Sequence, residues 1–251
     1  MSSWAKHPLR ASGRLLWLGL EFLLAAVNYA MSCAFCSSDN LPMARATWLQ
    51  RCSRRVLRIF GTETSVVGSI PQNGLLVCNH LSYLDILILA ALTPSRFIAK
   101  SEVRNWLVFG WFARLAGTIF VERSKRSQAA RAAEEIGVAL GEGPLVVLFP
   151  EGTSSGGETV LPFKSSLLEP ATRHLHALTA GLIAYELPDG NVSEEVCYWK
   201  DMTLVPHLLN FLSKRTLQAF VHFTEAPRET TDRKVLARQL HSEVVRLKTA
   251  M

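Results

Sequence analysis

A histidine and an aspartate stand five positions apart just after a short apolar segment. They are His80 and Asp85, in the sequence NHLSYLD, and residues 74–78 form the apolar segment. Two residues five positions apart on a regular helix point about 140° away from each other, so His80 must lie on the turn before a helix if Asp85 is to reach its ring. The carboxylate would then fix the imidazole tautomer through one nitrogen and leave the other as a general base, while Ser82 could cap the helix. Because such pairs are common by chance, these residues alone favour a simpler alternative, a capping histidine with a structural hydrogen bond.

A second polar turn, FPEGTS at residues 149–154, also follows an apolar segment. Gly152, Thr153 and Ser154 offer backbone and hydroxyl donors that suit an anionic or ester group, although a lone turn of this kind is usually an ordinary strand end. Residues 152–156 also match the G-x-S-x-G pattern of serine hydrolases, in which a helix starts directly after the serine. The glycines and the proline that follow predict turn and strand instead, so a serine esterase using Ser154 is the weaker alternative.

Two basic residues complete the polar set. Arg123 ends the segment GTIFVER, and Lys164 follows the segment LPF. Each is by itself typical of a solvated surface charge. Together, beside a histidine and an aspartate, they could hold a phosphate or a carboxylate.

These polar residues need a scaffold that brings the ends of several strands together. From residue 61 onward, short apolar runs alternate with stretches of helical periodicity, which predicts an α/β fold with a mixed, mostly parallel sheet flanked by helices. Open sheets of this kind bind ligands beyond the carboxyl ends of their strands. The expected strands are 64–67, 75–78, 96–99, 118–121, 145–149, 178–185, 195–198 and 216–223. The expected helices are 84–92, 106–116, 127–140, 165–174, 202–212 and 232–248.

The charge of the chain is divided unevenly. Of the net charge of +6 over 251 residues, all lies in residues 1–60, which hold eight basic and two acidic residues. Residues 61–251 hold 19 of each sign. Because a nucleic-acid-binding domain would spread its positive charge over the folded body, no nucleic-acid partner is expected.

The first 60 residues have the composition of a membrane anchor. Residues 15–36 are mostly apolar and, as a helix, could cross about 30 Å of hydrocarbon. Glu21 and Asn28 interrupt them and basic residues flank both ends, which favours an anchor that lies in one leaflet or re-enters it over a spanning helix, and a spanning helix over a signal peptide. A second helix is expected from Pro42, with one apolar face and several arginines, which suits docking on the protein core and on a membrane surface about equally. The sequence therefore predicts membrane-associating helices in residues 1–60 and an α/β domain that carries the polar residues in residues 61–251.

The chain has five cysteines, which is an odd number and few for a chain of this length. Two of them are close together in the sequence. A reducing compartment is expected from this usage. A structural zinc site needs four ligands at workable spacings, so no metal is expected.

The order of four segments, NHLSYLD, GTIFVER, FPEGT and PFKSS, resembles the glycerolipid acyltransferases of the 1-acylglycerol-3-phosphate type. That family has an H-x₄-D box, a G-x-x-F-x-x-R box and an F-P-E-G box, and the resemblance covers about residues 61–225. It implies a base and its partner in the first box, and acceptor binding by residues of the other boxes. The implied catalytic residues are His80 and Asp85, and the implied acceptor-binding residues are Arg123, Glu151, Gly152 and Thr153, with Lys164 beside them.

Two departures from the family pattern concern the substrates. Ala180 stands where the family usually has proline, and Ser166 stands where it often has glycine. Both departures affect the acyl-donor pocket and the identity of the acceptor. Related enzymes that acylate lyso-ornithine lipid share the first boxes.

The resemblance implies a membrane-bound O-acyltransferase that moves a fatty acyl group from acyl-CoA or acyl carrier protein to a lysophospholipid. The expected acceptor is 1-acylglycerol-3-phosphate, which would give phosphatidic acid, and lyso-ornithine lipid is the alternative. No cofactor is expected. The enzyme is expected at the membrane, with its catalytic domain on the cytoplasmic face. A serine esterase and a non-enzymatic membrane-surface module are the more distant alternatives.

Overall fold

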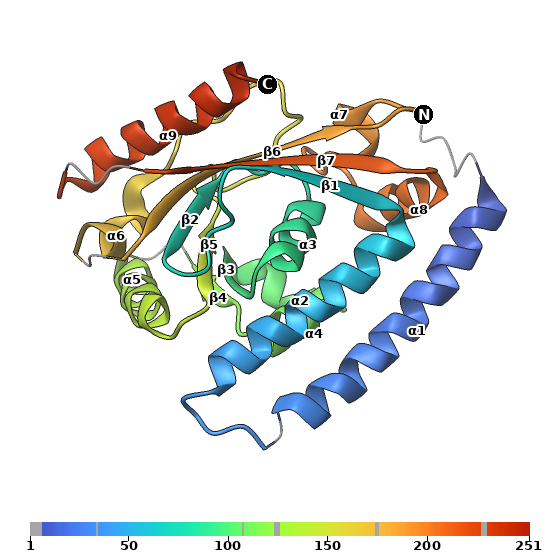
Figure 1. Cartoon of the computed structure of the whole chain (residues 1–251), viewed down its shortest axis with the longest axis horizontal. Coiled ribbons are helices and arrows are strands. Elements are labelled where there is room, and N and C mark those ends of the chain that lie inside the picture. Colours follow the sequence, from blue (N-terminus) through green and yellow to red (C-terminus); the bar gives the residue numbers. More distant parts are fainter. Residues whose placement is uncertain (1–6, 34, 107, 123–125, 174–175, 227–229) are drawn as a thin grey trace.

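Two long helices begin the chain. The computed structural model describes residues 7–33, 35–106, 108–122, 126–173, 176–226 and 230–251. Helix α1 (Pro8–Cys33) lies alongside α2 (Leu41–Phe60), as Figure 1 shows. Pro42 lies in the first turn of α2, as predicted, and α2 ends at Gly61, whose φ of 68° is left-handed backbone that favours glycine. Both helices belong to the core, because Leu18, Val56 and Phe60 lie in one apolar cluster with side chains of the sheet.

The sheet that follows has seven strands among the described residues, in the order β1-β7-β6-β2-β5-β3-β4. All neighbouring strands are parallel except β6 and β7, which are antiparallel. The central strands β2 and β5 are fully buried, as continuous apolar sequences such as LLVC and LVVL require in a sheet covered on both faces. The predicted mixed, mostly parallel sheet is confirmed. The strands are β1 (Thr62–Val67), β2 (Leu75–Cys78), β3 (Ser95–Lys100), β4 (Ile119–Val121), β5 (Leu145–Leu148), β6 (Leu178–Glu186) and β7 (Leu217–Glu225).

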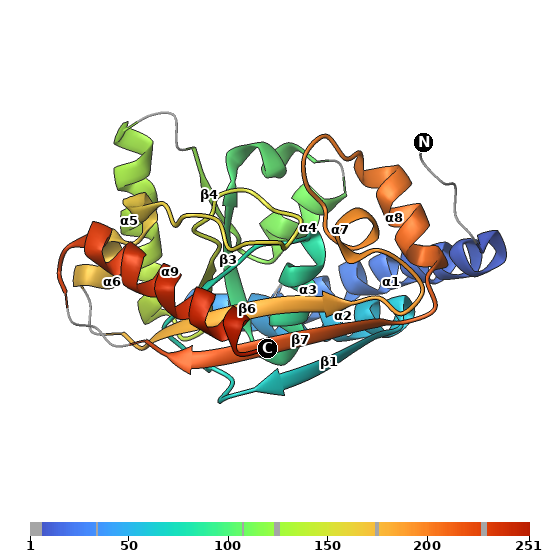
Figure 2. The same cartoon turned by 90° about the horizontal axis from the view of Figure 1, so that it is seen from above.

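Helices cover both faces of the sheet. Alternate residues of β2 divide between two apolar clusters: Leu76 packs in the cluster that contains residues of α2, α3 and α8, and Val77 in the cluster that contains residues of α5 and α9. In Figures 1 and 2, α5, α6 and α9 lie toward one end of the molecule and α1, α2 and α8 toward the other. The remaining helices are α3 (Tyr83–Leu92), η1 (Ser101–Asn105), α4 (Phe109–Leu115), α5 (Arg126–Gly141), η2 (Ser165–Leu167), α6 (Glu169–Arg173), α7 (Val192–Glu195), α8 (Leu204–Ser213) and α9 (Arg233–Thr249).

Three of the predicted elements differ from the structure. The predicted strand 195–198 is wrong: Glu195 ends the short helix α7, which the side chain of Asn191 caps by accepting from the backbone N–H of Glu194, and residues 196–198 belong to no strand. The predicted helix 165–174 is divided into η2 and α6, since Pro170 is tolerated only in the first turn of a helix and α6 therefore starts next to it. The predicted helix 106–116 is shorter, since α4 starts at Phe109.

Candidate active site

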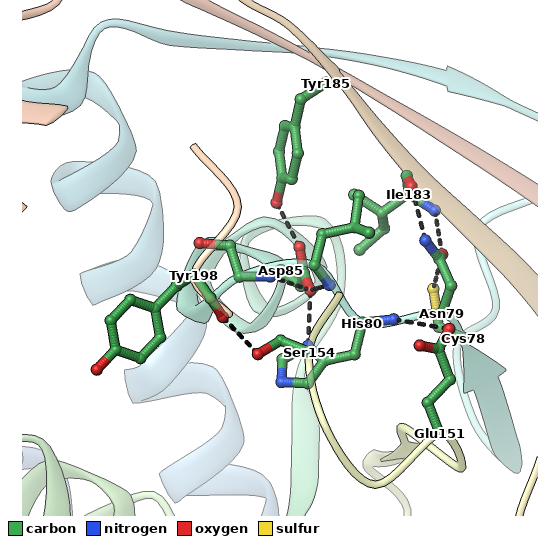
Figure 3. Close-up of polar contacts among 11 residues, drawn as sticks. Cys78, Asn79, His80, Asp85, Glu151, Ser154, Ile183, Tyr185 and Tyr198 are labelled. Carbon is green, nitrogen blue, oxygen red and sulfur yellow. Dashed lines mark hydrogen bonds and ion pairs between the residues drawn. The ribbon is translucent and has the colours of Figure 1, made fainter. Parts of the chain in front are cut away.

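The turn between β2 and α3 brings His80 and Asp85 together. Strand β2 ends at Cys78, Ser82 is the N-cap of α3, and His80 lies on the turn between them, as the five-residue spacing required. Its Nδ1 atom is 2.7 Å from Oδ2 of Asp85 (Figure 3). The ring of His80 stacks on Phe149 with 4.2 Å between the ring centroids, and the side chain is 21% exposed. The histidine is therefore held on one face and can still be reached.

The surroundings of Asp85 decide which nitrogen of His80 carries the proton. Asp85 is fully buried, and its Oδ2 accepts hydrogen bonds from the backbone N–H groups of Leu81 at 2.7 Å and Ser82 at 2.9 Å. The hydroxyl of Tyr185 donates to its Oδ1. A carboxylate that receives these donors is itself an acceptor, so Nδ1 of His80 must donate to it. In the neutral ring, Nε2 of His80 is then the nitrogen without a proton, and this is the nitrogen that a general base uses.

Tyr185 is a member of this site that the sequence did not reveal. Cys78 at the end of β2 pairs with Gly181 of β6, so β6 continues beyond β2 and carries Tyr185 to the level of the turn. Residues 181, 183 and 185 point to the same face of the sheet, and Ile183 lies on the face that α3 covers. Without the strand order, no sequence signal separated this tyrosine from the rest of a predicted strand.

Asn79 ties the same two strands together. Its side-chain amide donates to the backbone oxygen of Ile183 at 3.0 Å and its Oδ1 accepts from the N–H of Ile183 at 2.7 Å. This two-way bond fixes the end of β2 against β6. It thereby sets the distance from His80 to the strand that carries Tyr185.

The turn after β5 lies against the turn between β2 and α3, which carries His80. The backbone N–H of Ser155 donates to the carbonyl of His80 at 3.0 Å, and Gly152 has the positive φ of 72° that this tight turn requires. Oε1 of Glu151 accepts from the backbone N–H of His80 at 3.4 Å. The two polar turns that the sequence singled out are thus in direct contact. Thr153, on the same turn, is exposed.

Glu151 is buried and only partly satisfied. It is 2% exposed, and its Oε2 atom has no hydrogen-bond partner among the described residues. Burial, with the nearby Asp85 as a smaller cause, raises the pKa of Glu151 to about 8. Near neutral pH this side chain is therefore mostly a carboxylic acid, which can donate a hydrogen bond.

Ser154 is engaged elsewhere. Its hydroxyl donates to the backbone oxygen of Tyr198, and the described residues 155–164 after it contain no helix. A nucleophilic serine needs a base within reach and, in the serine hydrolase pattern, a helix directly after it. The geometry does not support the esterase alternative.

The segment of residues 196–203 is hydrogen-bonded to the turn that carries His80. The backbone N–H of Tyr198 donates to the carbonyl of Leu81 at 2.8 Å. His207 donates through Nε2 to the carbonyl of Cys197 at 3.1 Å, so its Nδ1 accepts from the hydroxyl of Tyr83 at 3.2 Å. Burial lowers the pKa of His207, which favours this neutral form. The segment predicted as a strand therefore helps to hold the start of α3.

The two predicted cations differ in what the structure says of them. The backbone N–H of Lys164 donates to the carbonyl of Pro150 at 2.9 Å, so Lys164 lies beside the turn of Glu151, and its side chain is exposed. Arg123 lies outside the described residues. An anion site formed by the two residues remains a prediction.

Two cavities lie near the site. An apolar cavity of about 80 Å³ lies between α1, α2, α3, α4 and α8, and its lining includes Phe22, Tyr83, Phe109 and Phe112. A larger cavity of about 490 Å³ opens beside Asn79 at the carboxyl end of β6. Tyr83 belongs both to the apolar cavity and to the first turn after His80.

Comparisons with known proteins show the family and the fold of this chain. A family model described as Acyltransferase matches residues 62–209. The chain is 37% identical to the lyso-ornithine lipid O-acyltransferase of Brucella abortus over 89% of this chain and 91% of that protein. It is 39% identical to the 1-acyl-sn-glycerol-3-phosphate acyltransferase of Neisseria gonorrhoeae over 40% of each chain. The crystal structure of the 1-acyl-sn-glycerophosphate (LPA) acyltransferase PlsC from Thermotoga maritima has the same fold, with a TM-score of 0.66 at 21% identity over 96% of this chain and 97% of that one. The chain belongs to the acyltransferase family, as its order of boxes predicted.

Proposed function

We propose that this protein is a membrane-bound O-acyltransferase that acylates the free hydroxyl of lyso-ornithine lipid, with acyl-CoA or acyl carrier protein as donor. The hydrogen bond between Nδ1 of His80 and the buried Asp85, which leaves Nε2 as the basic nitrogen of the neutral ring, is the observation that supports hydroxyl activation. The choice of acceptor is supported by the relative from Brucella abortus, because it matches over nearly its whole length.

The reaction follows from the positions of these two residues. Nε2 of His80 takes the proton of the acceptor hydroxyl while the oxygen attacks the carbonyl carbon of the thioester. Asp85 stabilises the positive charge that develops on the imidazole ring. The C–O bond forms, the C–S bond breaks, and the proton on Nε2 passes to the departing sulfur. The step balances without a metal or a cofactor, and it needs no covalent enzyme intermediate.

The apolar cavity beside Tyr83 supports a substrate with a hydrocarbon chain. Its lining by aromatic and aliphatic side chains suits methylene groups, and it lies just beyond the turn that carries His80. We assign it to part of a substrate acyl chain. The protonated carboxyl of Glu151, with Gly152, Thr153, Lys164 and Arg123, then serves the acceptor headgroup.

The surface of α1 supports a place at the membrane. Helix α1 is long and apolar enough to cross a bilayer. Its side chains Leu16, Trp17 and Leu23 are 77%, 65% and 68% exposed. Helix α1 also packs along α2 and α8, so a position in one leaflet keeps both sets of contacts. In this arrangement the catalytic domain lies on the cytoplasmic face, where the thioester donors are.

A second acceptor, 1-acylglycerol-3-phosphate, is favoured by one observation. The boxes around His80 and Glu151 are those of the enzymes that form phosphatidic acid, and the chain shares 39% identity with such an enzyme from Neisseria gonorrhoeae over 101 residues. A phosphate acceptor would use Arg123 and Lys164 as its charged partners.

The experiment that tests the function is an acyl-transfer assay in detergent with labelled acyl-CoA or acyl carrier protein and a panel of lysolipids. We expect kcat/KM to be highest for lyso-ornithine lipid, and His80→Ala to lower kcat by about 10² or more. A higher kcat/KM for 1-acylglycerol-3-phosphate would reverse the choice of acceptor and keep the mechanism. Full activity of His80→Ala would overturn the mechanism itself.

A further inference from the structure

A polar groove of about 300 Å³ lies between the carboxyl-terminal half of α1 and the amino-terminal part of α2. Helix α1 contributes Asn28 and Ser32, and α2 contributes Thr47 and Arg51, after Asn40 at its N-cap. These positions are separated by four on α1 and by four and seven on α2, so each set lies on one face of its helix. The two helices lie side by side at the edge of the molecule in Figure 1.

The charges in this groove are unbalanced. Arg55, at one end, makes an ion pair with the buried Glu21, with 2.7 Å between Nε and Oε1. Arg51 also lines the groove, but its guanidinium has no hydrogen bond or ion pair to any residue in the described part of the chain. The groove therefore contains one uncompensated positive charge together with several uncharged polar side chains, which is the composition of an anion site.

The rim of the groove indicates what kind of anion fits. Leu24 and Met31 lie four residues before and three residues after Asn28, so they are its neighbours on the surface of α1. They are 47% and 74% exposed. An anion that carries acyl chains would place its charge at Arg51 and its chains along the apolar face of α1. A small soluble anion would leave that apolar rim in water.

We propose that this groove binds the phosphate of an anionic membrane phospholipid, with Arg51 as the charged partner and Asn28, Ser32 and Thr47 as hydrogen-bond partners. The groove is distinct from the candidate active site, since its lining contains none of the residues around His80. The bound lipid is a fixed contact of the enzyme and not its substrate. The proposal needs a membrane but no acyl transfer, so it can fail or hold independently of the proposed function.

Arg58 provides a matched control. It lies seven positions after Arg51 on the same face of α2, it is exposed, and it does not line the groove. The full-length protein and its Arg51→Gln and Arg58→Gln variants would be titrated with vesicles of phosphatidylcholine, with and without phosphatidylglycerol, in the absence of any thioester. Circular dichroism and thermal melting would verify that both variants are folded.

We expect Arg51→Gln to lower the affinity for vesicles that contain phosphatidylglycerol by about tenfold and to leave weak binding to pure phosphatidylcholine unchanged. Arg58→Gln should lower the first affinity by less than about threefold. Equal losses in the two variants would mean that the arginines act only through their summed charge, and the groove would not be a site. If Arg51→Gln weakens the binding of inorganic phosphate measured without vesicles but leaves the affinity for vesicles that contain phosphatidylglycerol unchanged, the groove is a site for free phosphate and the lipid proposal is wrong.

Discussion

Two buried carboxylates lie on neighbouring turns at the carboxyl edge of the sheet, after the paired strands β2 and β5. Asp85 is 0% exposed and Glu151 is 2% exposed. Asp85 accepts from two backbone N–H groups, from the hydroxyl of Tyr185 and from His80. Glu151 accepts from the backbone of His80 through Oε1, and its Oε2 has no partner among the described residues. The two carboxylates are thus similarly buried but accept very different numbers of hydrogen bonds.

This difference separates two chemical roles that the sequence alone could not separate. Donors compensate a carboxylate for the water it loses on burial, so Asp85 is built to be a hydrogen-bond acceptor and a partner for a positive ring. Without enough donors, burial raises the pKa of Glu151 to about 8, and the side chain remains protonated near neutral pH. Asp85 is therefore suited to stabilise a charge on His80, and Glu151 to donate a hydrogen bond to a bound substrate.

Replacing each carboxylate by its amide tests the difference between Asp85 and Glu151 most directly. Asp85→Asn retains an oxygen for the backbone donors of Leu81 and Ser82 but no longer selects the tautomer of His80, so we expect kcat to fall by about 10² or more at pH 7. Glu151→Gln replaces a mostly protonated acid by another hydrogen-bond donor of similar shape, and kcat should fall by less than about tenfold.

Steady-state kinetics of the two variants, with melting curves as a check on folding, would measure this difference. Equal losses of kcat would contradict the distinction and assign Glu151 the role of an ionised group.

The hydroxyl of Tyr185 should have the next largest effect. Tyr185→Phe leaves Oδ1 of Asp85 buried without its donor, so the carboxylate is less well oriented toward His80. We expect kcat to fall by about tenfold with little change in KM.

Tyr29→Phe is the matched control, since its hydroxyl accepts from Nε of Arg45, between α1 and α2. A purely structural role for Tyr185 would lower the melting temperature and leave kcat of the folded protein unchanged.

The dependence of stability on pH should report Glu151 independently of activity. Its pKa in the folded protein, about 8, is above the ordinary value of 4.5 for a glutamate in water. Between these pH values the folded state binds the proton more tightly than the unfolded state, so the stabilising contribution of this group is full below pH 4.5 and is lost as pH rises through 8. For one proton the slope can approach about 1.4 kcal/mol per pH unit. Glu151→Gln should remove that slope. Chemical denaturation across this pH range would measure the free energy of unfolding of both proteins. Identical slopes in the variant and the wild-type protein would show that Glu151 is ionised when folded.

The position of His80 relative to Asp85 could be predicted from the sequence because it is local, whereas its role as a base followed from the order of the boxes and not from the two residues alone. Both residues lie on one turn and the following helix, so the geometry of the helix was enough to place His80 before it. The sheet was predictable for a similar reason, since apolar strands such as residues 75–78 and 145–148 are bounded by turns. Parallel order then followed from the alternation with helices.

Tyr185 and the segment that carries Tyr198 could not be predicted because their contacts depend on distant parts of the chain. Tyr185 reaches Asp85 only because β6 is the neighbour of β2 in the sheet. The strand predicted at residues 195–198 failed for the same reason: Glu195 is bound to Lys214 in the described structure, and Tyr198 to Leu81. The ion pair between Glu21 and Arg55 could not be predicted either, because in the sequence Glu21 is only an acidic residue that interrupts an apolar segment.

Ser154 should show the smallest effect, and it tests whether the turn of Glu151 holds the substrate or reacts with it. The hydroxyl of Ser154 makes one hydrogen bond, to the backbone oxygen of Tyr198. Ser154→Ala removes this contact between the turn and the segment over it but removes no group that moves a proton, so kcat should change by less than about threefold and the melting temperature should fall by a few degrees, as expected for about 1 kcal/mol. A fluorophosphonate probe should leave the wild-type protein unlabelled. If Ser154→Ala abolishes activity and the probe labels Ser154 in the wild-type protein, the serine is a nucleophile, and both the direct transfer to a lipid hydroxyl and the division of roles between Asp85 and Glu151 are wrong.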